Sequence, residues 1–427
     1  MKMAQRDKQE FLLERSVRFF ATLFNPHFLL RKVRYALMSG LALSIAPFAG
    51  AHAQQFSSIV AFGDSYADIG NIQDIMAANP PYDTYLPYLN THYLNGRFSG
   101  GTNYVDTLSS LYGISQSNYA LGGAQTGSLN QFNLTGFFPL PAGFSDEWRG
   151  FVDSGNVIAP NALVTLNIGG NDARDYYQRG GLMEGVSSAA AASADNAIEG
   201  INALVGAGAK TLVFTAGNVA DLPETPSSAV AVGFAYSQTY NNLMQQNLSK
   251  VAASGVRIEY VDLAMIESNI AANPPLYGLK YATASPIPGN SAQVNEYLFY
   301  VDQLHLTSAG FAIVANYIAN RLNAPETFAS SCELGFTVAD AFVGTMFDRL
   351  DLFNVATAKS SGASGTGSNS WAVFVQGNGV VSNRSSRDNS KGYHSDGLGT
   401  TLGIEYRPTS ETMVGTAYNY SSLIAKR

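Results

Sequence analysis

The chain has 427 residues, of which 46% are hydrophobic, 11% aromatic and only 13% charged, with a formal net charge of −7. This composition provides a buried core and excludes an intrinsically disordered chain. No cluster of Lys and Arg interrupts the region after the N-terminus, so we expect no nucleic-acid partner. Uncharged polar residues dominate instead, which is typical of a secreted or outer-membrane protein.

Residues 1–53 read as a signal peptide. An apolar, small-residue run from Tyr35 to Gly50 leads to Ala53, where we expect cleavage. Basic residues precede this run at Arg31, Lys32 and Arg34. A membrane anchor is the alternative, but the run is broken by Pro47 and falls short of the ~20 apolar residues that a spanning helix needs. The basic region before this run is longer than an ordinary signal peptide needs. Either it is an extended signal region, or translation starts at Met38.

The sequence predicts neither a disulfide nor a metal site. Cys332 is the only cysteine, so an intrachain disulfide cannot form. The sequence contains no CxxC, HExxH or paired-His spacing, which are the usual signatures of metal sites. We therefore expect no metal and no cofactor.

The first strong strand pattern ends on a turn that carries Ser65. Between Ser58 and Asn71, an apolar, β-branched run stops abruptly at Gly-Asp-Ser. In open α/β sheets the chemistry collects beyond the carboxyl ends of the strands, so Ser65 is placed as a nucleophile would be. Taken alone, the tripeptide fits an ordinary turn with a helix cap equally well.

The next segment is rich in Pro, Tyr and Asn. From residue 73 to 101 it predicts a long surface loop, of the kind that is often functional or wrapped over a site. Apolar spacing predicts a helix over 103–112, and residues 118–127 bring a short strand to a second glycine turn. Gly123 lies in that turn, where a need for positive φ alone would also explain a glycine.

Strands and helices then alternate along the chain. The clearest strand, 162–168, runs into a third polar turn that contains Asn171, which could also be an ordinary turn asparagine. The elements predicted after it are a helix over 182–206, a strand over 211–215, a helix over 229–254 and a strand over 257–261. This alternation predicts an α/β class with a parallel sheet covered on both faces.

A Pro- and Asn-rich segment, 262–295, reads as irregular. It leads to an apolar helix that is predicted to end at Leu322, with Thr307 or Ser308 as its N-cap. Asp302 and His305 therefore fall on the turn just before this helix.

The histidines offer few candidates for a general base. His27 and His52 belong to the predicted signal, and His394 to the C-terminal tail. His305 has Asp302 three residues before it, whereas His92 has no acidic neighbour in its Tyr-rich segment. A helix-capping acid and a surface histidine are the alternative reading of the first pair.

The turns that carry Ser65, Gly123, Asn171 and the pair Asp302 and His305 each follow an element that could belong to one sheet. These four turns would then meet at one edge of that sheet. Together they resemble the GDSL or SGNH hydrolases. The matching blocks, in the family's order, are Phe62-Gly-Asp-Ser65 with Asp68 and Asn71, Asn118-Tyr-Ala-Leu-Gly-Gly123, Gly169-Gly-Asn-Asp172, and Asp302-Gln-Leu-His305. Small departures are Tyr66, where the family name has Leu, and Ala67, where Ser is common. The Gly-x-Ser-x-Gly elbow of α/β-hydrolases is absent.

The resemblance implies a catalytic role for each block. It makes Ser65 the nucleophile, His305 the base and Asp302 the group that orients the base. The oxyanion hole would consist of the Ser65 N–H, the Gly123 N–H and the Asn171 side chain. It also implies a three-layer α/β/α, flavodoxin-like hydrolase domain over 54–325.

The C-terminal part changes character. A helix is predicted over 336–355 and a Ser/Gly-rich linker over 360–370, so that 326–369 form a helix and linker. Residues 370–427 alternate apolar and small polar residues, as outer-membrane strands do. The strands predicted there are 371–381, 398–406 and 412–420.

This layout resembles the esterase branch of the autotransporters, in which the helix threads a C-terminal barrel. Because about three strands cannot close a barrel, we expect the chain to be a fragment of a longer protein.

These observations predict an exported serine esterase or lipase held at the outer membrane by a C-terminal barrel. The expected partner is a small-molecule or lipid ester, and we expect a monomer. Two alternatives remain: an acyltransferase that uses the same site, and a catalytically silent surface adhesin with the same fold.

Overall fold

The computed structural model describes residues 56–132, 142–360, 370–385, 393–409 and 412–426. The predicted signal peptide lies outside the described residues, as does most of the Ser/Gly-rich linker. Within the described ranges, no helix contains a stretch long and apolar enough to cross a membrane.

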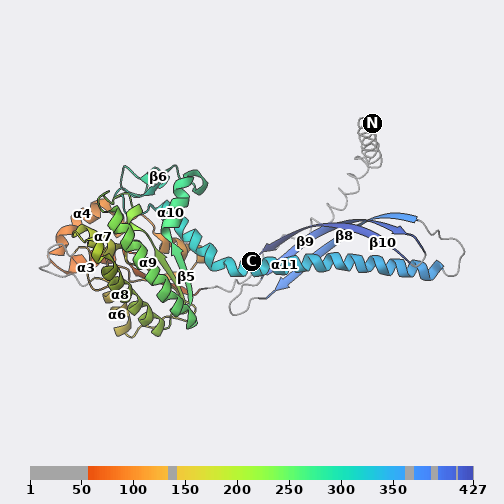
Figure 1. Ribbon diagram of the computed structural model, residues 1–427, viewed down its shortest axis with the longest axis horizontal. Coiled ribbons are helices and arrows are strands. Elements are labelled where there is room, and N and C mark those ends of the chain that lie inside the picture. The colour runs from red at the N-terminus through yellow and green to blue at the C-terminus, as the bar shows by residue number, and fades with distance from the viewer. Residues whose placement is uncertain (1–55, 133–141, 361–369, 386–392, 410–411, 427) are drawn as a thin grey trace, which may run out of the picture. The chain divides into compact units, whose positions relative to one another are not determined.

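Five parallel strands form the central sheet, in the order β2-β1-β3-β4-β5. Helices pack around this sheet (Figure 1). The bounds of the strands are β1 Ser58–Gly63, β2 Ser115–Asn118, β3 Leu163–Asn167, β4 Thr211–Ala216 and β5 Arg257–Asp262. This order is that of flavodoxin-like sheets, so the predicted fold class and strand order are confirmed. The carboxyl ends of all five strands therefore lie on one edge.

Both faces of the sheet are buried under helices. Alternate residues of β1 enter different cores: Val60 and Phe62 pack in one, Ile59 and Ala61 in the other. The first core includes residues of α6 Phe144–Asp153, α8 Val186–Gly206 and α9 Val230–Ala253. The second includes residues of α5 Tyr104–Tyr112, α10 Leu263–Ala272 and the first turns of α11 Ser308–Ser360. Asn103 caps α5 through a capping box.

The segment 73–101 is not the irregular loop that the sequence predicts. It forms a chain of short helices: α3 Asn71–Ala78, α4 Leu86–His92 and 3₁₀ turns at Tyr82–Tyr85 and Leu94–Gly96. Ile72 and Met76 anchor α3 in the core. The prolines of this segment predicted a loop, but Pro87 lies at the start of α4, where a missing N–H costs nothing.

The segment 262–295 is also more regular than predicted. It contains α10, whose N-cap Asp262 accepts a hydrogen bond from the Met265 N–H at 3.0 Å. Beyond it, β6 Tyr281–Ala284 pairs with β7 Tyr297–Phe299 in a small parallel sheet. Further 3₁₀ turns lie at Met183–Gly185, Val219–Asp221, Pro274–Tyr277 and Val294–Glu296.

The two helices predicted at 308–322 and 336–355 are one helix. Thr307 caps it, since its Oγ1 accepts a hydrogen bond from the Gly310 N–H at 3.1 Å. Residues 323–335 continue the helix although they lack a clear apolar stripe and include Pro325 and Gly335, which are poor helix formers. The separation predicted from periodicity was therefore wrong.

Three long antiparallel strands follow: β8 Ser370–Arg384, β9 Tyr393–Arg407 and β10 Val414–Lys426, in the order β10-β9-β8. Along β9, Leu398 and Leu402 are exposed whereas Thr401 and Glu405 are buried. Arg349 of α11 binds Glu405 with two 2.8 Å hydrogen bonds. The predicted alternation of apolar and polar faces is confirmed, and the strands are longer than predicted.

Candidate active site

Ser65 lies on the turn that follows β1, and backbone contacts fix this turn. Gly63 has φ 120°, and a Cβ added there would lie 2.1 Å from the Asn167 carbonyl oxygen, so only glycine fits. The Gly63 N–H donates to Glu147 Oε2 at 2.7 Å, and the Asp64 N–H donates to Asn167 O at 3.0 Å. Ser65 itself is 7% exposed.

The structure brings Asp302 and His305 to Ser65. His305 Nε2 lies 2.7 Å from Ser65 Oγ, and His305 Nδ1 lies 2.6 Å from Asp302 Oδ2. Both residues lie between β7 and α11, on a turn in which Gln303 has φ 64°. The other oxygen of Asp302 accepts the Leu304 and His305 N–H groups, each at 3.0 Å. This is the serine–imidazole–carboxylate order that acyl transfer requires.

The electrostatics of Asp302 favour its charged form. Burial alone would raise the pKa of this carboxyl. The charge of His305 and the hydrogen bonds from His305 and Leu304 outweigh burial, so that the pKa of Asp302 lies below its ordinary value. An ionised carboxylate at this position can hold the imidazole in one tautomer and stabilise its protonated form.

The short helices of 73–101 supply groups to this site that the sequence did not single out. The Tyr93 hydroxyl donates to Asp302 Oδ2 at 2.9 Å, and the ring of Phe98 lies 4.9 Å from that of His305, between centroids. His92 is not brought to the site: its Nδ1 lies 2.9 Å from Tyr88 O, and its ring stacks on Tyr88. Nothing in the local pattern marks Tyr93 among the tyrosines of this segment.

The loop that carries Gly123 is bound on both sides of that residue. The Leu121 N–H donates to Gly63 O at 2.8 Å, and the Gly122 N–H donates to Asp68 Oδ2 at 2.6 Å. On the other side, the Asn171 side chain donates from Nδ2 to Ala124 O at 2.9 Å. Gly123 has φ 78°, as its turn position predicts. The segments that carry Gly123 and Asn171 therefore meet beside the turn of Ser65.

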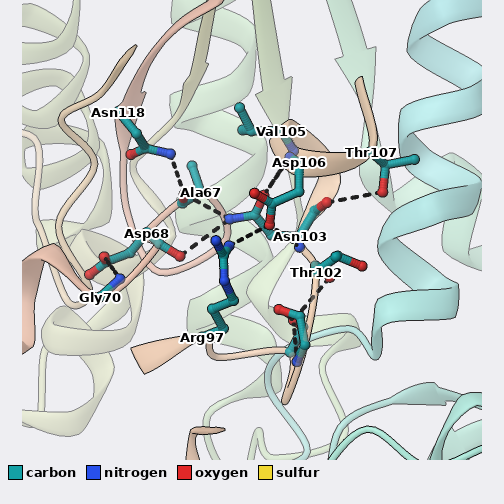
Figure 2. Close-up of polar contacts among 12 residues, drawn as sticks. Ala67, Asp68, Gly70, Arg97, Thr102, Asn103, Val105, Asp106, Thr107 and Asn118 are labelled. Atoms are coloured by element: carbon teal, nitrogen blue, oxygen red, sulfur yellow. Dashed lines mark hydrogen bonds and ion pairs between the residues drawn. The ribbon is translucent and has the colours of Figure 1, made fainter. Parts of the chain in front are cut away.

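Asp68 and its surroundings hold the nucleophile turn in place (Figure 2). Asp68 accepts hydrogen bonds from the N–H groups of Gly70, Asn71, Ile72 and Gly122. Burial raises its pKa to about 6, although these four donors oppose the rise. Figure 2 shows Asn103 and Asn118 both directed at the Ala67 carbonyl, each at 2.8 Å, and Arg97 paired with Asp106. These residues support the site and do not face the pocket.

Asn171 opens α7 Gly170–Gln178, and its amide is fixed at both ends. Its Nδ2 donates to Ala124 O, and its Oδ1 accepts from Arg174 Nη1 at 3.2 Å. Arg174 is in turn bound by Glu224 through hydrogen bonds of 2.5 and 2.9 Å. The Glu224 N–H donates to Gln303 O at 3.1 Å, so one ion pair connects the Asn171 block to the turn of Asp302 and His305.

A pocket that is partly open to solvent lies against these residues. Ser65, Asn171 and Arg174 line it, together with residues that follow β4 and with Glu267 of α10. Asp64 also lines it; burial raises the pKa of Asp64 to about 7, against the opposing effects of the Tyr66 N–H and Arg174. Within the described ranges, no group of three or more His, Cys, Asp or Glu side chains is arranged to hold a metal ion.

Comparison with known proteins gives the family. Residues 59–318 match the GDSL-like lipase/acylhydrolase family. The chain belongs to this family. GDSL-like lipases and acylhydrolases act on carboxylic esters, and the chain is accordingly a carboxylic ester hydrolase.

Curated relatives of this GDSL hydrolase come from bacteria and plants. It is 25% identical over 292 residues to a phosphatidylcholine-sterol acyltransferase of Aeromonas hydrophila, covering 65% of this chain and 82% of the relative. It is 27% identical over 189 residues to a GDSL esterase/lipase of Arabidopsis thaliana, covering 37% and 49%. It also matches an uncharacterised protein of Pseudomonas putida at 27% identity, over 69% of this chain and about half (52%) of that protein.

Solved structures similar to this GDSL hydrolase include the aryl esterase of M. smegmatis. That match covers 63% of this chain and 99% of the esterase, with a TM-score of 0.33 and 13% identity. A G-D-S-L lipolytic protein of Veillonella parvula matches over 61% of this chain and 94% of its own, with a TM-score of 0.32 and 12% identity.

Proposed function

We propose that this GDSL hydrolase cleaves its ester through an acyl intermediate on Ser65. The observation that supports this most directly is the contact of 2.7 Å between His305 Nε2 and Ser65 Oγ, with Asp302 on the other ring nitrogen. Ser65 Oγ attacks the ester carbonyl carbon while His305 takes its proton. The imidazolium, stabilised by Asp302, then returns the proton to the departing alcohol.

The same groups release the acyl chain. Water attacks the acyl-Ser65 carbonyl, and His305 takes the proton of the water and passes it to Ser65 Oγ as the acid leaves. The negative oxygen of each tetrahedral intermediate is stabilised by the N–H groups of Ser65 and Gly123 and by the Asn171 amide. The hydrogen bonds that flank Gly123 and fix Asn171 support this role, because preorganised donors need not reorient during the reaction.

The proposal is tested by trapping the nucleophile. Purified protein should hydrolyse p-nitrophenyl esters, and an alkyl phosphonate should inactivate it with one adduct per chain. Peptide mapping should place the adduct on Ser65. An adduct on another serine would refute the assignment.

A second candidate is acyl transfer at the same site. One relative is named a phosphatidylcholine-sterol acyltransferase, and an alcohol in the pocket could replace water as the acceptor. Product analysis with an added alcohol separates the two: a transferase forms a new ester in proportion to the alcohol, and a hydrolase forms mainly the free acid. A silent surface adhesin is disfavoured because all the required groups are assembled.

We also propose that the enzyme is exported and displayed at the cell surface, in the manner of autotransporter esterases. Residues 1–53 would direct export, and residues 370–427 would contribute strands to an outer-membrane β-barrel. The exposed apolar face of β8–β10 supports this, because lipid-facing strands alternate apolar and polar side chains. Esterase activity on intact cells that external protease removes would be the expected result, and activity confined to lysates would contradict it.

A further inference from the structure

The pocket contains a carboxyl group that ester hydrolysis does not use. Glu267 lies on α10, is only 8% exposed and lines the same pocket as Ser65 and Asn171. Within the described part of the chain, its carboxyl makes no hydrogen bond and no ion pair. The carboxyl oxygens are not among the described polar atoms that are sealed from solvent without a partner, so they remain accessible to a ligand.

Several polar side chains that line the pocket together with Glu267 have partners of their own. The Tyr240 hydroxyl donates to Ile168 O at 3.1 Å, and the Asn241 amide donates to Gly217 O at 3.0 Å. Ser237 Oγ accepts the Val219 N–H at 3.2 Å. Glu267 differs from these three side chains, because its carboxyl has no hydrogen-bond partner in the described part of the chain and remains available to a ligand.

The charges around Glu267 are negative. Burial, followed by the nearby carboxylates Asp221 and Asp262, raises its pKa to about 8. The pocket does contain a guanidinium, that of Arg174, but Glu224 binds it. The pocket wall therefore includes the carboxyl groups of Glu267 and Asp64 and a guanidinium that is already paired, which favours a cation and disfavours a carboxylate or phosphate.

We propose that Glu267 forms a subsite for a positively charged group on the ester, with a quaternary ammonium as the best fit. Tyr66 and Tyr240 line the same pocket, and aromatic residues suit such a cation. On binding, the cation takes the place of the proton on Glu267, which passes to solvent. The inference rests on the proposed role of Ser65, because the subsite orients the ester relative to this nucleophile.

Two pairs of matched esters test the subsite, one pair for each half of the ester. Choline butyrate is compared with 3,3-dimethylbutyl butyrate, its neutral isostere. The p-nitrophenyl ester of 4-(trimethylammonio)butyric acid is compared with that of 5,5-dimethylhexanoic acid. In the wild-type enzyme, kcat/KM should favour the cationic member of at least one pair by about tenfold.

The variant Glu267→Gln should abolish that preference, and Glu199→Gln, an exposed glutamate on α8, should retain it. No cationic preference in either pair, or a preference that survives in Glu267→Gln, would overturn the proposal.

A measurement on the wild-type enzyme alone avoids any folding defect of the variant. Tetramethylammonium chloride should inhibit hydrolysis of p-nitrophenyl butyrate competitively, and sodium chloride at equal ionic strength should not. Equal inhibition by both salts would count against the subsite. If p-nitrophenyl butyrate is hydrolysed without Ser65, the proposed function fails; if Ser65 is required but cations have no effect, only the subsite fails.

Discussion

The Tyr93 hydroxyl donates a 2.9 Å hydrogen bond to Oδ2 of Asp302, the same oxygen that faces His305 Nδ1. Burial, followed by the charge of Asp302 and this hydrogen bond, raises the pKa of Tyr93 far above its ordinary value. The phenol is therefore a permanent donor in the working pH range. The Tyr93 hydroxyl and the His305 imidazole therefore both interact with the negatively charged Oδ2 of Asp302.

Tyr93→Phe should shift the acid limb of the kcat/KM profile to higher pH, by about half a unit. Without the phenol, more of the negative charge on Asp302 acts on His305 and favours its protonated form. The control is Tyr88→Phe, an exposed tyrosine of the same segment, which should leave the limb in place. A loss of activity with no shift of the limb would indicate a packing role for Tyr93.

Ser65→Ala should reduce ester hydrolysis by about 10⁴-fold or more and leave the fold unchanged. A hydroxyl at the end of a strand contributes little to stability, whereas it is the atom that forms the acyl intermediate. Activity is measured with p-nitrophenyl esters and folding by circular dichroism. Retained turnover in this variant, with loss in another serine variant, would move the nucleophile elsewhere.

His305→Ala should abolish the acid limb that a histidine base gives to the pH–rate profile, together with most of the activity. His92→Ala should retain both, because the ring of His92 is bound to the backbone and side chain of Tyr88. An inactive His92→Ala enzyme would contradict the assignment of the base.

Asn171→Ala should lower kcat by roughly 10²–10³-fold with a smaller change in KM, since an oxyanion donor acts on the transition state. Arg174→Gln should lower kcat in the same direction, because Arg174 holds Oδ1 of the amide and keeps Nδ2 available as a donor.

A double-mutant cycle separates this positioning role from a general structural one. If Arg174 acts through Asn171, Arg174→Gln should cost almost nothing further in the Asn171→Ala background. Arg179→Gln, which breaks an exposed ion pair at the C-terminal end of the same helix, is the control and should leave kcat unchanged. Additive losses would show that Arg174 acts independently of the amide.

Glu267 predicts how stability depends on pH. In the folded chain its carboxyl keeps the proton up to about pH 8, whereas in the unfolded chain it loses it near the ordinary value of 4.5. The folded state binds more protons between these values, so this group makes the free energy of unfolding fall as pH rises from about 5 to 8. Thermal melts should show a smaller fall of Tm over this range in Glu267→Gln than in the wild type. Equal slopes would refute the raised pKa.

The sequence was most informative where a strand is buried and its polar turn is short. Apolar runs located β1, β3, β4 and β5, and the spacing of three residues between Asp302 and His305 indicated one turn. The sequence did not single out Tyr93, because 209 residues separate it from Asp302 and no motif links the two. The strand β2, with the sequence Ser-Gln-Ser-Asn, has no apolar pattern, because it is an edge strand whose place is set by pairing with β1.

The close approach of Gly63 to Asn167 has a consequence for how this enzyme can change. Two backbones, rather than any side chain, set the height at which Ser65 stands above the sheet. Replacing residues of the pocket wall can therefore alter which ester is accepted without displacing the nucleophile. Mutant libraries aimed at new substrates should vary residues of that wall, including Leu222, Leu263 and Leu304. They should retain Gly63 and Asn167, whose backbones meet at the ends of β1 and β3.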